Sequence, residues 1–238
     1  MYSTIIFDLD DTLTDDNENV KQAFKTLLKY LNETYTDEKF EKFRRIDLKT
    51  WKDRAAGNLP TPYDNGNDKD KKAEWLRCYR FINYFDNNIS HKEALKMNDI
   101  YLDGLKEKVV SREGSLDIIK YLYSKNYKLI IATNGPSIAL KTKLERLNIY
   151  KYIQTMFSAD EVGHMKPNKE FYEGLFKKAG IVNTKDILLI GDELEKDIKG
   201  GIENHIDTCW VNYNKKENLS KYIPKYEINK LSELEQIL

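Results

Sequence analysis

The hydrophobic pattern changes twice along the chain. Residues 5–9 form a short apolar run, and the residues after it, up to about position 105, repeat their apolar positions at helical spacing. Beyond residue 112, short apolar runs alternate with helical stretches. These later runs cover 128–132, 152–158, 187–190 and 208–211. A continuous apolar run of this length, flanked by turn formers, is typical of a strand buried on both faces of a parallel sheet.

This alternation predicts an α/β fold with a Rossmann-like parallel sheet and right-handed crossovers. Because a long helical segment separates the first strand from the others, we expect a core of residues 1–15 and 112–238. An all-helical cap domain, residues 16–111, would be inserted after strand one. The predicted cap helices cover 17–30, 37–56, 71–85 and 92–105, and the predicted core helices cover 115–124, 137–147, 168–179 and 193–203. Residues 56–70 form the longest loop-like segment.

Composition narrows the possible function classes. The chain has 39 Lys and Arg residues and 39 Asp and Glu residues. It therefore lacks the excess of basic residues that is typical of a nucleic-acid-binding protein. No apolar run is long enough to cross a bilayer, and the N-terminus lacks a signal-peptide pattern, so we expect a cytoplasmic protein. Cys78 and Cys209 are expected to be reduced core residues. The three histidines lack zinc-ligand spacing, so any metal should be a hard cation held by oxygen.

Polar residues follow the predicted strands at their carboxyl ends, where open α/β sheets bind ligands. We therefore expect these residues to share one site. They are Asp8, Asp10 and Thr12 after the first strand, Thr133, Asn134 and Gly135 after the second, Asp192 and Asp197 after residues 187–190, and Lys166 ahead of the helix at 168.

Carboxylates dominate this set and imply a cation. Strand alternation places Asp8 and Asp10 on one side, where both can stay ionised only with a cation between them. With Asp192 as a third acid ligand, the set suits Mg²⁺, which takes oxygen ligands and also binds a substrate phosphate. Lys166 adds a fixed positive charge beside these acids.

The remaining donors indicate phosphate chemistry. Thr133, Asn134 and the backbone N–H groups of a strand-to-helix turn can donate to phosphate oxygens. One carboxylate of strand one would then be the nucleophile that forms an aspartyl-phosphate. The other would protonate the leaving oxygen and later deprotonate the attacking water.

Four ordered segments, DLDDTLTD, ATNG, GHMKP and the GDxxxxD that begins at Gly191, resemble the four motifs of the haloacid dehalogenase (HAD) superfamily of phosphohydrolases. The resemblance covers the whole predicted core, and the helical insertion resembles the type 1 cap of that family. It implies Asp8 as the nucleophile, Asp10 as the general acid/base and Lys166 as the charge that stabilises the phosphoryl group.

The same resemblance implies the binding residues. Thr133 and Asn134 would bind phosphate. Mg²⁺ would be held by Asp8, by the backbone carbonyl of Asp10 and by Asp192. Asp197 would support Lys166 or the waters of the metal.

The C-terminal segments IDTCWVN (206–212) and IPKYEINKLSEL (223–234) resemble the bacterial pyrimidine 5′-nucleotidase branch of the superfamily. This implies pyrimidine nucleoside 5′-monophosphates as substrates. A phosphatase or phosphomutase acting on sugar phosphates or phosphoglycolate is the open alternative. Asp10 argues against a metal-independent haloacid dehalogenase, whose branch lacks that acid, and the complete motif set argues against a non-catalytic binding module. The expected partner is a small-molecule phosphate ester, with no nucleic acid polymer and no membrane, and the chain would be a monomer or a dimer.

Overall fold

The computed structural model describes residues 2–64 and 66–238. The chain divides into two compact units, one of Met1–Asp16 with Val109–Leu238 and one of Asn17–Lys108. Asn65, within the predicted loop of residues 56–70, lies outside the described residues. In the described part of the chain, no helix has both the length and the apolar character needed to cross a bilayer.

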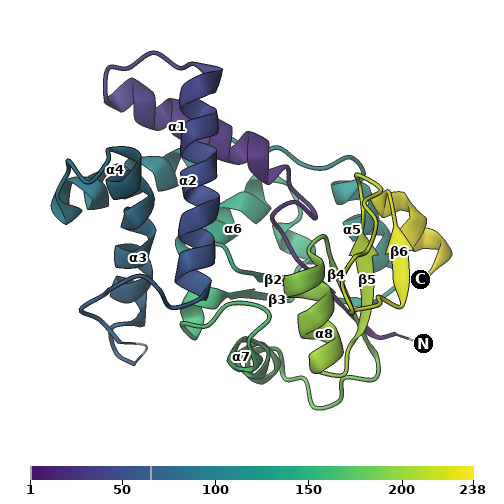
Figure 1. Cartoon of the computed structure of the whole chain (residues 1–238). Helices are drawn as coiled ribbons and strands as arrows, with labels where there is room; N and C mark the ends of the chain where they lie inside the picture. The colour runs from purple at the N-terminus through teal and green to yellow at the C-terminus, as the bar shows by residue number, and fades with distance from the viewer. Residues whose placement is uncertain (1, 65) are drawn as a thin grey trace. The chain divides into compact units, whose positions relative to one another are not determined.

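A six-stranded parallel sheet forms the centre of the first unit (Figure 1). Its strands are β1 (Thr4–Phe7), β2 (Lys128–Thr133), β3 (Thr155–Ser158), β4 (Ile187–Gly191), β5 (Asp207–Val211) and β6 (Tyr226–Ile228). Their order is β3-β2-β1-β4-β5-β6, so the first strand of the chain lies between two strands from far along it. Ile6 of β1 is paired with Ile130 of β2 and with Leu189 of β4. The predicted α/β class with a parallel sheet is confirmed.

Helices cover both faces of this sheet. On one face, α5 (Ser115–Ser124), α6 (Ser137–Arg146) and the C-terminal 3-10 helix Leu231–Gln236 share an apolar core with alternate strand residues such as Ile5 and Phe7. On the other face lie α7 (Lys169–Ala179) and α8 (Lys199–Glu203). There, Phe171 packs edge-on against Phe157, and Gly201 lies against Leu189. Alternate residues of each strand therefore face two different cores, as the apolar runs predict.

The second unit is helical and has its own core. Its residues form α1 (Asp16–Tyr30, which begins in the first unit), α2 (Asp37–Ala55), α3 (Lys69–Tyr84) and α4 (His91–Glu107). The core is aromatic: Phe24 stacks on Phe43 with ring centroids 4.5 Å apart. Helices α2 and α4 begin at N-cap residues that favour a helix start. The Thr36 side chain accepts the N–H of Lys39, and Ser90 forms a capping box with Glu93.

Candidate active site

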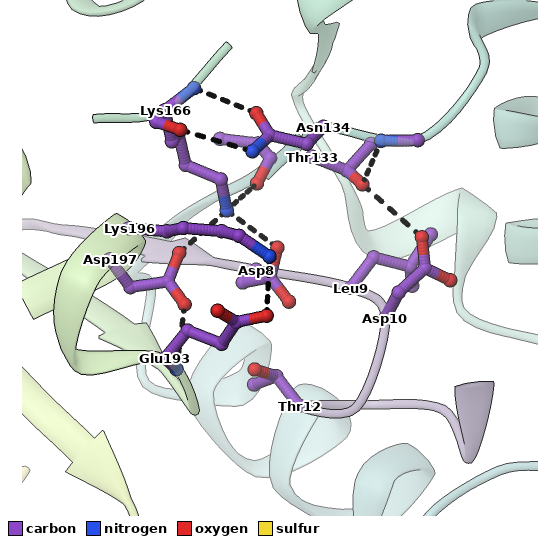
Figure 2. A network of polar contacts seen from close by, with 12 residues as sticks. Asp8, Leu9, Asp10, Thr12, Thr133, Asn134, Lys166, Glu193, Lys196 and Asp197 are labelled. Atoms are coloured by element: carbon purple, nitrogen blue, oxygen red, sulfur yellow. Dashed lines mark hydrogen bonds and ion pairs between the residues drawn. The ribbon is translucent and has the colours of Figure 1, made fainter. Parts of the chain in front are cut away.

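The carboxyl ends of three neighbouring strands bring the predicted residues together. Phe7 of β1 is level with Ile131 of β2 and Ile190 of β4, so the residues that follow leave the sheet at one edge. The N–H of Asp8 still donates to the carbonyl of Ile190, at 2.9 Å, which holds Asp8 at the carboxyl end of β4. Figure 2 shows the resulting network, with the Asp8 carboxylate beside the Lys166 ammonium.

Lys166 links two of the predicted acids. Its Nζ donates to Oδ1 of Asp8 at 2.5 Å, to Oδ1 of Asp197 at 2.6 Å and to the carbonyl of Ala132 at 3.0 Å (Figure 2). The side chains of Lys166 and Asp197 are each 2% exposed. Burial lowers the pKa of Lys166, but the charges of Asp197 and Asp8 outweigh it and raise that pKa above its usual value. The lysine is therefore a permanent positive charge at the base of the site.

Asp197 reaches Lys166 through an unusual turn. The predicted single helix over 193–203 is instead a π-helical turn, Leu194–Ile198, followed by α8. The turn places the Asp197 carboxylate directly against the backbone of Gly191, where a Cβ would lie 2.3 Å from the Asp197 Cγ. The N–H of Glu193 also donates to Oδ2 of Asp197, at 3.1 Å. The spacing GDxxxxD thus requires glycine at its first position, and the wide turn is of the kind that occurs at functional sites.

Asp8, Asp192 and Asp197 form a group that fits a divalent cation. One carboxylate oxygen from each lies within 4.8 Å of the others. Thr12 donates to Oδ1 of Asp192 at 3.1 Å, and the Trp210 indole N–H donates to the Asp192 carbonyl at 2.8 Å, so the third acid is held in place. Three ionised carboxylates beside Lys166 leave a net charge of −2. The oxygen donors and this charge suit Mg²⁺.

The electrostatics of the three carboxylates agree with that fit. Burial raises the pKa of Asp8 to about 7, against the opposing charge of Lys166. Burial and the charges of Asp8 and Asp197 raise the pKa of Asp192 well above its usual value. A cation bound here would neutralise the surplus charge and polarise a substrate phosphate. One oxygen each of Asp8, Asp192 and Asp197 could hold it, and Asp197 also has its predicted role of supporting Lys166.

Asp10 is paired with a lysine that the sequence analysis missed. Its carboxylate points toward Thr133 in Figure 2 and lies outside the three-carboxylate group, so its predicted contact with the metal, through the backbone carbonyl, stays a prediction. Nζ of Lys143 donates to its Oδ1 at 2.6 Å. Burial raises the pKa of Asp10, but Lys143 outweighs it and lowers that pKa below the usual value. The expectation that a cation must lie between Asp8 and Asp10 was thus incomplete, because each carboxylate has its own lysine.

The predicted phosphate binders flank this pair. The Thr133 hydroxyl donates to Oδ2 of Asp10 at 3.4 Å and accepts the N–H of Gly135 at 2.9 Å. The Asn134 amide accepts the N–H of Lys166 at 2.7 Å and donates to the Lys166 carbonyl at 3.2 Å (Figure 2). Its side chain therefore holds the lysine loop, and its predicted contact with a phosphate oxygen stays a prediction.

We expect Mg²⁺ to stabilise the protein more at about pH 8 than at about pH 5. Because the pKa values of Asp8 and Asp192 are raised, the metal-free native state binds more protons than the unfolded chain between about pH 4 and the native pKa of about 7 for Asp8. Metal-free stability should therefore fall as the pH rises through this window. Mg²⁺ replaces those protons. At a free Mg²⁺ concentration of about 100 times the dissociation constant, binding should add about 2.7 kcal/mol to the free energy of unfolding. Thermal unfolding with and without Mg²⁺ measures this, and an equal Tm shift at both pH values would contradict it.

Comparison with known proteins identifies the family. The model of the haloacid dehalogenase-like hydrolase family matches residues 5–211. The pyrimidine 5′-nucleotidase YjjG of Escherichia coli is 29% identical over 236 residues, covering 98% of this chain and 96% of the relative. The pyrimidine 5′-nucleotidase PynA of Streptococcus pneumoniae is 26% identical over 233 residues, covering 98% and 93%.

A solved structure agrees with these relatives. The magnesium-bound crystal structure of the HAD-hydrolase YfnB from Bacillus subtilis has a TM-score of 0.84 and 28% identity to this chain, and the match covers 100% of this chain and 98% of that one. The family model spans all four sequence motifs, and the likeness in fold extends over the full length. The chain belongs to the haloacid dehalogenase-like hydrolase family.

Proposed function

We propose that the protein is an Mg²⁺-dependent phosphatase that hydrolyses pyrimidine nucleoside 5′-monophosphates through an aspartyl-phosphate on Asp8. The observation that carries the proposal is the buried pair of Lys166 and Asp8, 2.5 Å apart, within a group of three carboxylates at the edge of the sheet. A buried lysine beside a carboxylate and a metal site supplies the positive charge that a transferring phosphoryl group requires.

The first half of the proposed reaction uses Asp8 and Asp10. Lys166 holds Oδ1 of Asp8, so Oδ2 is the oxygen that bonds to phosphorus. As this bond forms, the bond from phosphorus to the leaving oxygen breaks, and Asp10 gives that oxygen the proton that it took from water at the end of the preceding cycle. Thr133 and the backbone N–H of Asn134 donate to the non-bridging oxygens. Bound Mg²⁺ would neutralise charge on the phosphate and on the carboxylates.

The second half releases phosphate. The Asp10 carboxylate takes a proton from water, the water oxygen bonds to phosphorus, and the bond between phosphorus and Asp8 breaks. This step needs Asp10 in its ionised form, and Lys143 keeps it in that form in this structure. Asp8 returns to a carboxylate beside Lys166, ready for another cycle.

The substrate class rests on two lines of support. Two relatives that match nearly the whole chain are named pyrimidine 5′-nucleotidases. The residues of the first unit that form the site bind phosphate and metal, so discrimination among phosphate esters is proposed to come from the helical unit, Asn17–Lys108. The predicted type 1 cap would have this role.

A panel of phosphate esters tests the proposal. We expect UMP, dUMP or dTMP to be hydrolysed with higher kcat/KM than AMP, GMP, hexose phosphates or phosphoglycolate. The Asp8→Asn variant, purified in parallel, controls for contaminating phosphatases. If hexose phosphates or phosphoglycolate exceed every pyrimidine nucleotide by about tenfold, or about 1.4 kcal/mol in transition-state binding, the nucleotidase assignment is wrong and the phosphatase assignment stands.

A further inference from the structure

A second buried lysine lies beside the candidate active site. The Lys143 side chain, on α6, is 4% exposed, and its ammonium is 2.6 Å from Oδ1 of Asp10. Removing an ammonium group from water is costly, so a lysine this buried requires a charged partner. The same helix offers a contrast in Lys141, which is 60% exposed and 3.7 Å from Glu145. Lys143 is thus built into the site, whereas its neighbour is a surface residue.

Lys143 makes the shortest of the contacts that hold the Asp10 carboxylate. The hydroxyls of Thr14 and Thr133 are 3.4 Å from its Oδ1 and Oδ2, which is longer than the usual range for such bonds. Gly135 closes the remaining side, since a Cβ there would lie 2.8 Å from Oδ2. Charge-assisted bonds are shorter and stronger than bonds between neutral groups. The direction of the carboxylate is therefore set mainly by the lysine.

We infer that Lys143 is a positioning residue that holds Asp10 in place for hydrolysis of the phosphorylated Asp8, an inference that rests on the proposed function. In that step the water oxygen bonds to phosphorus, its proton passes to Asp10, and the bond from phosphorus to the Asp8 oxygen breaks. The water must meet a carboxylate oxygen at a fixed place, because such catalysis depends on geometry. Lys143 acts on this step only through Asp10.

The kinetic signature follows from the two-step reaction. With p-nitrophenyl phosphate, the leaving nitrophenolate needs no proton, so transfer of the phosphoryl group to Asp8 does not depend on Asp10. Lys143→Met should slow only the hydrolysis of the intermediate, and kcat should fall about tenfold to a hundredfold. KM should fall by the same factor, which leaves kcat/KM unchanged. Phosphorylated enzyme should accumulate in the steady state, and acid quenching followed by mass spectrometry measures it.

Matched variants separate positioning from a general loss of structure. Lys141→Met should match the wild type, and Lys143→Arg, which keeps the charge, should recover part of kcat. Adding Lys143→Met to Asp10→Asn should cause no further loss, because the residue through which Lys143 acts is already changed. This double variant also removes both charges of the pair, so the test holds if Lys143→Met alone folds poorly.

Three results would overturn the inference: a fall in kcat/KM for p-nitrophenyl phosphate as large as the fall in kcat, a further loss in the double variant, or no extra phosphoenzyme in Lys143→Met. Failure of the proposed function looks different. In that case the wild-type chain itself would form no phosphoenzyme with any phosphate ester. A wild type that forms phosphoenzyme, with a Lys143→Met variant that accumulates no more of it, refutes only the role of Lys143.

Discussion

Replacing Asp8 by Asn should abolish the phosphoenzyme and lower phosphatase activity by about 10⁴-fold or more, the scale observed when a catalytic nucleophile is removed. An amide oxygen carries no charge with which to attack phosphorus. The change is otherwise conservative, since the side chain keeps its shape and can still accept a bond from Lys166 through its oxygen. The expected loss therefore reports chemistry rather than folding. Rapid acid quenching after mixing with substrate, followed by mass spectrometry of the peptide that contains residues 5–16, measures the phosphorylated fraction.

Asp11→Asn is the matched control for this experiment. Asp11 lies in the same cluster of acids, but its carboxylate pairs with Arg112 at 2.9 Å and accepts the N–H of Asp16 at 3.1 Å. Its φ of 68° is one that asparagine tolerates well. We expect activity within about threefold of the wild type, because surface ion pairs contribute little. A phosphoenzyme that persists in Asp8→Asn on the same peptide would assign the nucleophile to another residue.

Much of the fold could be predicted because short apolar runs in the sequence indicate which segments are buried strands. The runs at 5–9, 128–132 and 187–190 each contain at least three consecutive apolar residues without alternation, and each contains a strand at the centre of the sheet. The first strand ends at Phe7 rather than Leu9, and a turn at residues 11–13 follows it. The segment 193–203 was predicted as a single helix, and its first part is instead a π-helical turn, because apolar periodicity does not report the close contact between Asp197 and Gly191.

The candidate site was predictable to the extent that it lies at strand ends. Asp8, Thr133 and Asp192 follow strands directly, and the sheet alone brings them to one edge. Lys143 lies ten residues beyond Thr133, within a helix that contains one other lysine, Lys141. The available signal was its place on the buried face of α6, beside Ala139, Leu140 and Leu144. A lysine on an apolar face needs a partner, but only the folded chain identifies that partner as Asp10.

Replacing Lys166 by Met should have two opposite effects. Turnover should fall by about 10² to 10³-fold, the usual cost of removing a donor that stabilises developing charge. Mg²⁺ should bind at least as tightly as before, because Lys166 and the cation compensate the same carboxylates. Without the lysine, the group formed by Asp8, Asp192 and Asp197 has a net charge of −3 when ionised, and it attracts a divalent cation more strongly. Isothermal titration with Mg²⁺ measures this affinity independently of activity.

Two further variants test this reasoning. Lys178→Met is the matched control, since Lys178 is exposed and pairs with Glu161 on the surface, so its loss should change neither turnover nor Mg²⁺ binding. Lys166→Arg keeps the charge but brings a larger, planar group into a fully buried position, so it should restore the lower Mg²⁺ affinity without restoring turnover. If Lys166→Met instead weakens Mg²⁺ binding, the lysine organises the carboxylates for the metal rather than sharing their charge with it. The three-carboxylate group would then not bind Mg²⁺ through charge balance.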